Sequence, residues 1–101
     1  MHEHQFQFDW DQTKAAANFL KHGVSFELAA SIFGDPRILT PLTQRTASQK
    51  ERWFSIGLAS TGAIMSVAYL WTDAGTGLIK IRLITARRAM ASEIRYYLES
   101  Q

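Results

Sequence analysis

The chain has 101 residues, of which 47% are hydrophobic and 20% charged, with a net charge of +2 and no cysteine. This length allows one compact domain over residues 1–101, and the composition excludes disordered and fibrous proteins. The lack of cysteine excludes disulfides and thiolate metal sites. Residues 1–11 lack a secretory apolar region, and the apolar run at 63–71 is too short to cross a bilayer as a helix, so we expect a soluble cytoplasmic protein without a membrane partner.

A short strand is predicted at the start, because HQFQFDWD alternates polar and apolar residues and places Phe6 and Phe8 on one face. Two aspartates follow it. Asp9 and Asp11 are both competent helix N-caps, and DWDQ also matches a capping box in which Gln12 reaches back. A helix from about residue 11 to residue 22 is therefore expected next.

The helical period divides this helix into an apolar and a polar side. Its apolar side carries Ala16, Phe19 and Leu20, and its polar stripe consists of Lys14, Asn18, Lys21 and His22. Gly23 stands where a helix ends with positive φ, and Ser25 is placed to cap a second helix. The apolar residues of that second helix follow at helical spacing before Gly34 stops it: Phe26, Ala29, Ala30 and Phe33.

The second half of the chain predicts a sheet and a closing helix. Residues 35–49 contain two prolines and are mostly polar after Leu42, which indicates a short edge strand and then a mobile loop. Three strand-like runs at 51–60, 63–72 and 77–86, joined by TG and DAGTG, predict an antiparallel meander. A helix over residues 89–100 has an apolar stripe of Met90, Ile94, Tyr97 and Leu98. The order of elements is that of an α+β domain.

No nucleotide or metal signature is present: the sequence lacks a phosphate-binding glycine loop, HExxH, an EF-hand and a triad spacing around a serine. His2 and His4 flank Glu3 with a spacing compatible with adventitious metal binding, but a floppy terminus explains them better. Gly75 and Gly77 lie between two strands and indicate a hairpin turn. We therefore expect neither a metal nor a cofactor.

Cations form the remaining pattern. Between residues 80 and 95 the chain carries five basic residues against one acid, Glu93, and Lys80 and Arg82 leave the same face of their strand. If this face meets the polar stripe of the first helix, a basic cleft results. Such a cleft suits RNA, because cleavage by the 2′-hydroxyl needs a base, an acid and cations that stabilise the charged transition state.

Each candidate also has a structural interpretation. Histidine exchanges protons near neutral pH, so His22 is a candidate catalyst, but a cation in the last helical turn also gains about 0.3–1 kcal/mol from the helix dipole. Arginine forks bind phosphate oxygens, but strand arginines also pair with acids such as Glu27, Glu51 or Glu93. Glu93 and Tyr97 are spaced to orient Arg87, whereas core packing with a hydrogen-bonded hydroxyl is the commoner role of tyrosine.

Three segments carry a family resemblance: FDWDQTKAAANFLKHGVSFELAASIFGDP, ERWFSIG and IRLITARRAMASEIRYY. Together they resemble the BrnT family of bacterial type II toxins over nearly the whole chain. The resemblance implies a RelE-like α+β fold, with an antiparallel sheet packed against N-terminal helices and a C-terminal helix. It also implies a metal-independent endoribonuclease that inhibits translation. The implied partners are RNA and a BrnA-like, DNA-binding antitoxin. The chain is expected to form either a homodimer or a hetero-oligomer of toxin and antitoxin.

The matching positions include most of the cations singled out above, and Thr85 stands where the family usually has serine. A non-catalytic RNA-binding or protein-interaction module of the same fold is the alternative. For the enzyme, we expect catalytic roles for His22, Arg52, Arg82 and Arg87, RNA contacts from Lys14, Lys21, Lys80 and Arg88, and supporting roles for Asn18, Glu51, Glu93 and Tyr97.

Overall fold

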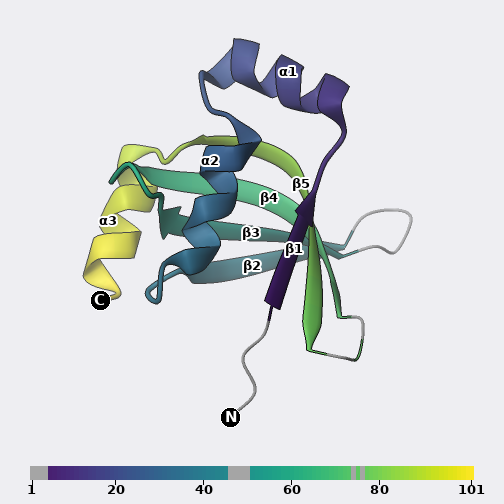
Figure 1. Cartoon of the computed structure of the whole chain (residues 1–101). Helices are drawn as coiled ribbons and strands as arrows, with labels where there is room; N and C mark the ends of the chain where they lie inside the picture. The colour runs from purple at the N-terminus through teal and green to yellow at the C-terminus, as the bar shows by residue number, and fades with distance from the viewer. Residues whose placement is uncertain (1–4, 46–50, 74, 76) are drawn as a thin grey trace.

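The structure, a computed structural model, describes residues 5–45, 51–73, 75 and 77–101 (Figure 1). Its elements confirm the predicted α+β order. They are β1 (Gln5–Asp9), α1 (Gln12–His22), α2 (Phe26–Ala30), the 3₁₀ turn η1 (Ser31–Gly34), β2 (Leu39–Arg45), β3 (Glu51–Leu58), β4 (Ile64–Asp73), β5 (Leu78–Arg88) and α3 (Ala91–Glu99). The predicted mobile loop lies largely at residues 46–50, outside the described residues.

The strands form one sheet in the order β1-β5-β4-β3-β2. The predicted antiparallel meander of β3, β4 and β5 is confirmed, as is the edge position of β2. β1 adds to the other edge, parallel to β5, with Gln5 opposite Leu78 and Asp9 opposite Arg82. The N-terminal strand is therefore a neighbour of the last strand, which the sequence pattern did not indicate.

The core lies on the face of the sheet that α2 and η1 cover (Figure 1). Alternation along β4 and β5 buries one set of side chains there, such as Val67 and Ile81, against Phe26 and Ile32. Each fully buried side chain of this size contributes about 1.5–3 kcal/mol. Gly57 permits the close contact with η1, because a Cβ at this position would lie 2.9 Å from the Cβ of Ile32.

The caps of α1 are partly as predicted. Asp11 is the N-cap and accepts hydrogen bonds from the N–H groups of Thr13 and Lys14, which lower its pKa. The predicted capping box from Asp9 is wrong, because the Asp9 carboxylate pairs with Arg82. Gly23 ends the helix at φ 70°, as predicted. Ser25 caps α2 as predicted, accepting from the Leu28 N–H at 3.1 Å.

The polar side of α1, and not its apolar side, faces the sheet. Asn18 is buried, with 7% of its surface exposed, whereas Phe19 and Leu20 are 54% and 87% exposed. The Asn18 amide donates to the Ala86 carbonyl (2.8 Å) and accepts from the Ala86 N–H (3.0 Å). Because β1 ends opposite Arg82, no strand of the described sheet borders β5 beyond that point on this side. The amide of Asn18 therefore takes the place of a neighbouring strand.

Helix α3 packs on the other face of the sheet, near β3. The predicted apolar stripe is only partly right: Tyr97 is buried and Ile94 half-buried, but Met90 and Leu98 are exposed. The Tyr97 hydroxyl donates to Asp35 at 2.6 Å, and burial followed by this carboxylate raises the pKa of Tyr97 to about 12. The prediction of core packing with a hydrogen-bonded hydroxyl is confirmed.

Among the described residues, the structure has no helix with the length and hydropathy needed to span a bilayer.

Candidate functional site

The face of the sheet opposite α2 carries the cations. The strand register places Arg52 opposite Leu70, Leu70 opposite Arg82, and Lys80 opposite Thr72, so these side chains share one face. Phe54, Ala68 and Thr85 form the next row. We call this surface the open face, made of Arg52, Phe54, Leu70, Lys80, Arg82 and Thr85. Adjacent strands lie about 4.8 Å apart, so the backbones of Arg52 and Arg82 are about 10 Å apart, with Leu70 between them.

A β-bulge brings further residues of β5 to this face. The register shifts between Ala68, opposite Thr85, and Tyr69, opposite Leu83, which leaves Ile84 without a partner in β4. Because one residue is inserted, Arg82 and Thr85 lie on the same face although they are three apart in sequence. Alternation then returns Arg87 to that face. The bulge therefore aligns two arginines and a threonine along β5.

A hollow of about 310 Å³ separates α1 from β5. Its lining includes Ile84 and Thr85 from the bulge and the whole polar stripe of α1: Lys14, Asn18, Lys21 and His22. His22 is half-buried at the end of the helix, directly before Gly23. The structure thus brings the polar stripe to the edge of the open face, where Asn18 holds the helix and the cations line the hollow.

Arg82 makes an exposed ion pair. Its Nη1 donates to Oδ2 of Asp9 at 3.0 Å, and the two side chains are 49% and 66% exposed. An exposed pair of this kind contributes roughly 0–1 kcal/mol. Sequence reasoning missed Asp9 as the partner, because only the parallel pairing of β1 with β5 places the two residues opposite each other.

Arg87 is held much more firmly. Its two terminal nitrogens donate to the two oxygens of Glu93 at 2.8 and 3.0 Å, and its guanidinium carbon lies 5.9 Å from the centre of the Phe54 ring. Glu93 also accepts from the Ser66 hydroxyl and the Met90 N–H. The hydrogen bonds from Arg87, followed by those from Met90 and Ser66, outweigh burial and lower the pKa of Glu93 to about 2. The bond to Glu93 raises the pKa of Arg87.

The structure separates some of the candidates from this cluster. Glu93 orients Arg87 as predicted, but Tyr97 does not, because its hydroxyl binds Asp35. Arg88 alternates with Arg87 and lies on the opposite face of β5, across from Met65. Glu51 opens β3 opposite Arg45, and its side chain is outside the described part of the chain. His2 and His4 also lie outside it.

The glycine-rich segment after β4 joins two antiparallel strands, so the predicted hairpin is confirmed. Gly75 and Gly77 have φ values of 79° and 85°, in the region that favours glycine. Sequence reasoning had no means to identify Leu70 and Ile84 as parts of the site. Leu70 is placed by the register and Ile84 by the bulge, and neither has a signal in an apolar strand sequence.

Comparison with models of known protein families identifies the family of this chain. The model of the family described as "Ribonuclease toxin, BrnT, of type II toxin-antitoxin system" matches residues 10–93. The chain belongs to the BrnT family. The resemblance noted in the sequence is thereby confirmed, and with it membership of a family of ribonuclease toxins from type II toxin-antitoxin systems.

A solved structure supports the assignment of the fold. The 1.1 Å crystal structure of the Brucella abortus ribonuclease toxin BrnT is similar with a TM-score of 0.57 and 19% sequence identity, covering 85% of this chain and 99% of that chain. At this identity the likeness shows the fold alone, and it confirms the predicted α+β architecture of the family. Comparison with the curated proteins finds no match.

Proposed function

We propose that this BrnT-family chain is a single-domain toxin over residues 1–101 that cleaves RNA without a metal and thereby inhibits translation. Family membership supports the ribonuclease class. The observation that carries the mechanism is the row Arg52–Leu70–Arg82 on the open face, with the polar stripe of α1 lining the hollow beside it.

The reaction is an internal phosphoryl transfer. The 2′-oxygen of a ribose attacks the adjacent phosphorus, the bond from phosphorus to the 5′-oxygen breaks, and the products are a 2′,3′-cyclic phosphate and a 5′-hydroxyl. A base takes the proton of the 2′-hydroxyl, and an acid protonates the departing 5′-oxygen. Negative charge grows on the phosphorane oxygens. Arg52 and Arg82 lie on the two sides of Leu70 in the sheet, and their guanidinium forks match the geometry of phosphate oxygens.

His22 is the side chain that we assign to proton transfer, with Lys14 or Lys21 as the alternative carrier. His22 lines the hollow together with Thr85, Lys14 and Lys21, and histidine is the side chain that exchanges protons near neutral pH. Metal independence is supported by the chemistry of the assembled groups. Guanidinium and ammonium ions stabilise the phosphorane charge themselves and repel a divalent cation.

RNA binding is assigned to lysines at the margins of the site. Lys80 is exposed beside Arg82, and Lys14 and Lys21 line the hollow on α1. They contact backbone phosphates, so binding should weaken as salt is raised. We leave Arg88 out of this surface because it lies on the other face of β5. Arg87 is on the same side of the sheet as the open face, but we assign it to positioning, since its fork is directed at Glu93.

The inhibitory partner is a cognate DNA-binding antitoxin. Membership of a type II toxin family implies such a partner. The open face presents exposed cations to it, so the inhibitor should cover this surface with acidic or apolar side chains and exclude RNA.

The test is cleavage of single-stranded RNA by the purified protein in excess EDTA, with analysis of the 3′ ends. We expect full activity and cyclic phosphate ends, and His22→Gln should lower the rate by about 100-fold or more without changing the melting temperature. Arg95→Ala, at an exposed arginine of α3, is the matched control and should be as active as the parent. Loss of all cleavage in EDTA, or 3′-hydroxyl ends, would contradict the mechanism. No cleavage under any condition would favour a non-catalytic RNA-binding or protein-interaction module.

A further inference from the structure

One aromatic ring lies among the cations of the open face. Of the described strand residues on this side of the sheet, Phe54 is the one with an aromatic side chain, and it is half-buried. Arg52 precedes it by two residues on the same face of β3, about 6.6 Å away along the strand. Leu70 lies opposite Arg52. The row of residues that we assign to the phosphate therefore has a ring directly beside it.

The Phe54 ring is held from the side of α3. The guanidinium carbon of Arg87 lies 5.9 Å from the ring centre, within the range of a cation–π contact. Arg87 is itself fixed by both oxygens of Glu93, which also accepts hydrogen bonds from the Ser66 hydroxyl and the Met90 N–H. These contacts restrain the ring without burying it fully, so its place on the open face is set before a substrate binds.

We propose that Phe54 is the stacking platform for an unpaired nucleobase next to the scissile phosphate, so that the substrate is RNA with an unstacked base at the cleavage position. The inference rests on the proposed function, because it takes RNA as the ligand of the open face. It deepens that function by naming the kind of RNA. In this role Phe54 binds substrate, and Arg87 positions its ring.

A nucleotide fits the chemistry of this surface better than an apolar protein side chain does. Cations interleaved with an aromatic ring are the combination that binds single-stranded nucleic acid, because the cations hold the backbone while the ring stacks on a base. Exposed cations surround Phe54 and the half-buried Leu70, namely Arg52, Lys80 and Arg82. A nucleotide brings both a phosphate for the arginines and a flat ring for Phe54, whereas an apolar side chain brings only a partner for the ring.

Stacking on Phe54 determines two properties of the substrate. In a duplex each base is paired and stacked between its neighbours, so it reaches a protein ring only by leaving the helix. Single-stranded RNA should therefore be cleaved at least about tenfold faster than a duplex of the same sequence. The phenyl ring has no hydrogen-bonding group, so it accepts every base through its flat face and does not select among them.

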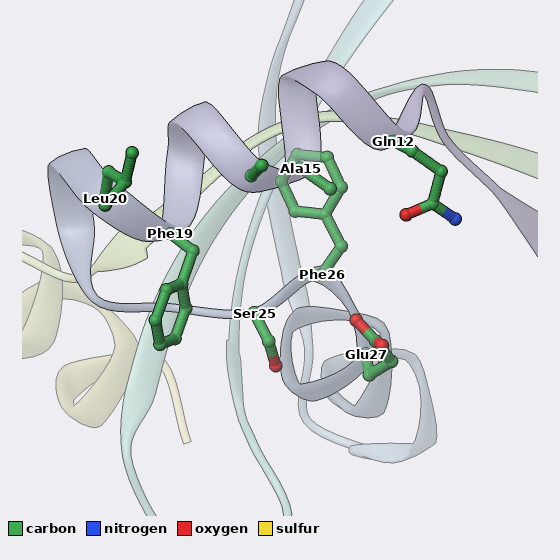
Figure 2. A pocket seen from close by; sticks show the side chains of 8 residues that line it. Gln12, Ala15, Phe19, Leu20, Ser25, Phe26 and Glu27 are labelled. Atoms are coloured by element: carbon green, nitrogen blue, oxygen red, sulfur yellow. The ribbon is translucent and has the colours of Figure 1, made fainter.

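Phe19 supplies a matched control, because it allows the same substitution at another exposed ring. Its side chain is 54% exposed on α1. Figure 2 shows the ring directed from α1 toward Ser25, where it lines the groove between α1 and α2. Lys14 and Lys21 line the hollow beside β5 instead. Phe19→Leu should therefore leave RNA binding and cleavage at the level of the parent.

The experiment varies the ring of the full-length protein and the base of the RNA together. Single-stranded oligonucleotides carry an abasic ribose at each nucleotide flanking the scissile phosphate in turn, and versions with a 2′-O-methyl group at the scissile ribose are uncleavable and serve for equilibrium titration. For the parent, one abasic position should weaken binding and raise KM about tenfold or more. Phe54→Leu should show this loss with the complete RNA and no further loss with that abasic RNA, while kcat stays close to that of the parent. Phe54→Tyr keeps a ring and should bind like the parent.

Equal losses from the abasic ribose in the parent and in Phe54→Leu would overturn the proposal, because ring and base would then act independently. A duplex cleaved as fast as the single strand would overturn it too, as would Phe19→Leu with the same effect as Phe54→Leu. Weakened antitoxin binding at unchanged RNA binding in Phe54→Leu would assign the ring to the protein partner instead.

Two features of the design keep the result interpretable. Comparison of two RNAs within each variant cancels any decrease in the fraction of folded protein. Failure of the proposed ribonuclease function would be visible separately, as absent cleavage by the parent in EDTA, while titration with the uncleavable RNAs would still show whether Phe54 and the base are coupled.

Discussion

Arg82 and Arg87 leave the same face of the same strand, yet the structure uses them differently. Arg82 pairs through Nη1 with Asp9, and about half of its side chain is exposed. Arg87 places both terminal nitrogens on Glu93, with side chains that are 32% and 14% exposed, and so fixes the start of α3 against β4 and β5. The neighbours of an arginine, and not its position on a basic strand, decide whether its guanidinium stays exposed or holds two elements of the fold together.

The energetic consequence follows from this difference. An exposed pair exchanges its carboxylate for a phosphate oxygen with little change in free energy, because water already screens the interaction. A pair that is partly buried and hydrogen-bonded on both sides loses more when its partner leaves. This difference supports the proposed role of Arg82 in the transition state, whereas Arg87 holds α3 through Glu93.

The largest effect is expected for Arg82→Ala. Removal of a donor that acts mainly in the transition state typically lowers the rate about 100- to 1000-fold, so single-turnover cleavage should fall by that factor with a smaller loss of RNA binding. The free energy of unfolding should change by no more than about 0.5 kcal/mol. Single-turnover kinetics and urea unfolding measure the two quantities. A stability loss comparable to that of a Glu93 variant would remove the distinction between the two arginines.

The next effect is one of stability. Glu93→Gln removes the charge that accepts from Arg87, and we expect the free energy of unfolding to fall by about 1.5–3 kcal/mol. The isosteric amide keeps the shape of the side chain, so the change reports the charge. Urea unfolding at neutral pH measures it, with Glu99→Gln at an exposed position of the same helix as the control. A loss no larger than that of the control would show that the pair with Arg87 is not structural.

The pH dependence of stability also tests the pair of Arg87 and Glu93, because the lowered pKa of Glu93 fixes the direction in which stability changes with pH. The pKa of Glu93 is lowered from 4.5 to about 2 in the folded protein, so its contribution is complete above about pH 4.5 and is lost as the pH falls toward 2. The stability difference between the parent and Glu93→Gln should therefore shrink through this window. Asp35, whose pKa is also lowered, titrates in both proteins and cancels in the difference. A difference that is constant from pH 5 to pH 2 would contradict the assignment.

The sequence predicted elements better than it predicted which sides of them meet. Period-two and helical patterns, caps and glycines located the strands, α1, α2 and the order of the meander, because these signals are local. Helix α1 was amphipathic, and such a helix ordinarily buries its apolar side. Here one amide, Asn18, completes the hydrogen bonds of β5, and that long-range requirement turns the polar side inward.

The sequence indicated which charged residues gather at the candidate site, but it did not indicate how they are arranged. Lys80 and Arg82 were placed on one face by alternation alone, as observed. The pairing of Arg82 with Asp9 depends on a parallel contact between the two ends of the chain, and the alignment of Thr85 with Arg82 depends on the bulge at Ile84. Neither has a local pattern, because strand partners are chosen by the packing of the whole sheet.

The smallest expected effect concerns the other anchor of α3. Tyr97→Phe keeps the buried ring but removes the hydroxyl that donates to Asp35, and this should lower the free energy of unfolding by about 1 kcal/mol, since the N–H groups of Leu58 and Arg37 still satisfy the carboxylate. Burial works to raise the pKa of Asp35, but these three hydrogen bonds outweigh it and leave the pKa lowered, so removal of one should raise it. The part of the stability that Asp35 loses in acid should then be smaller in Tyr97→Phe than in the parent. RNA cleavage should stay at the parent rate, because the hydroxyl is directed at Asp35 and not at the open face. A cleavage rate that falls tenfold or more at nearly unchanged stability would instead place Tyr97 in the site with Arg52 and Arg82, and would show that α3 supplies chemistry as well as structure.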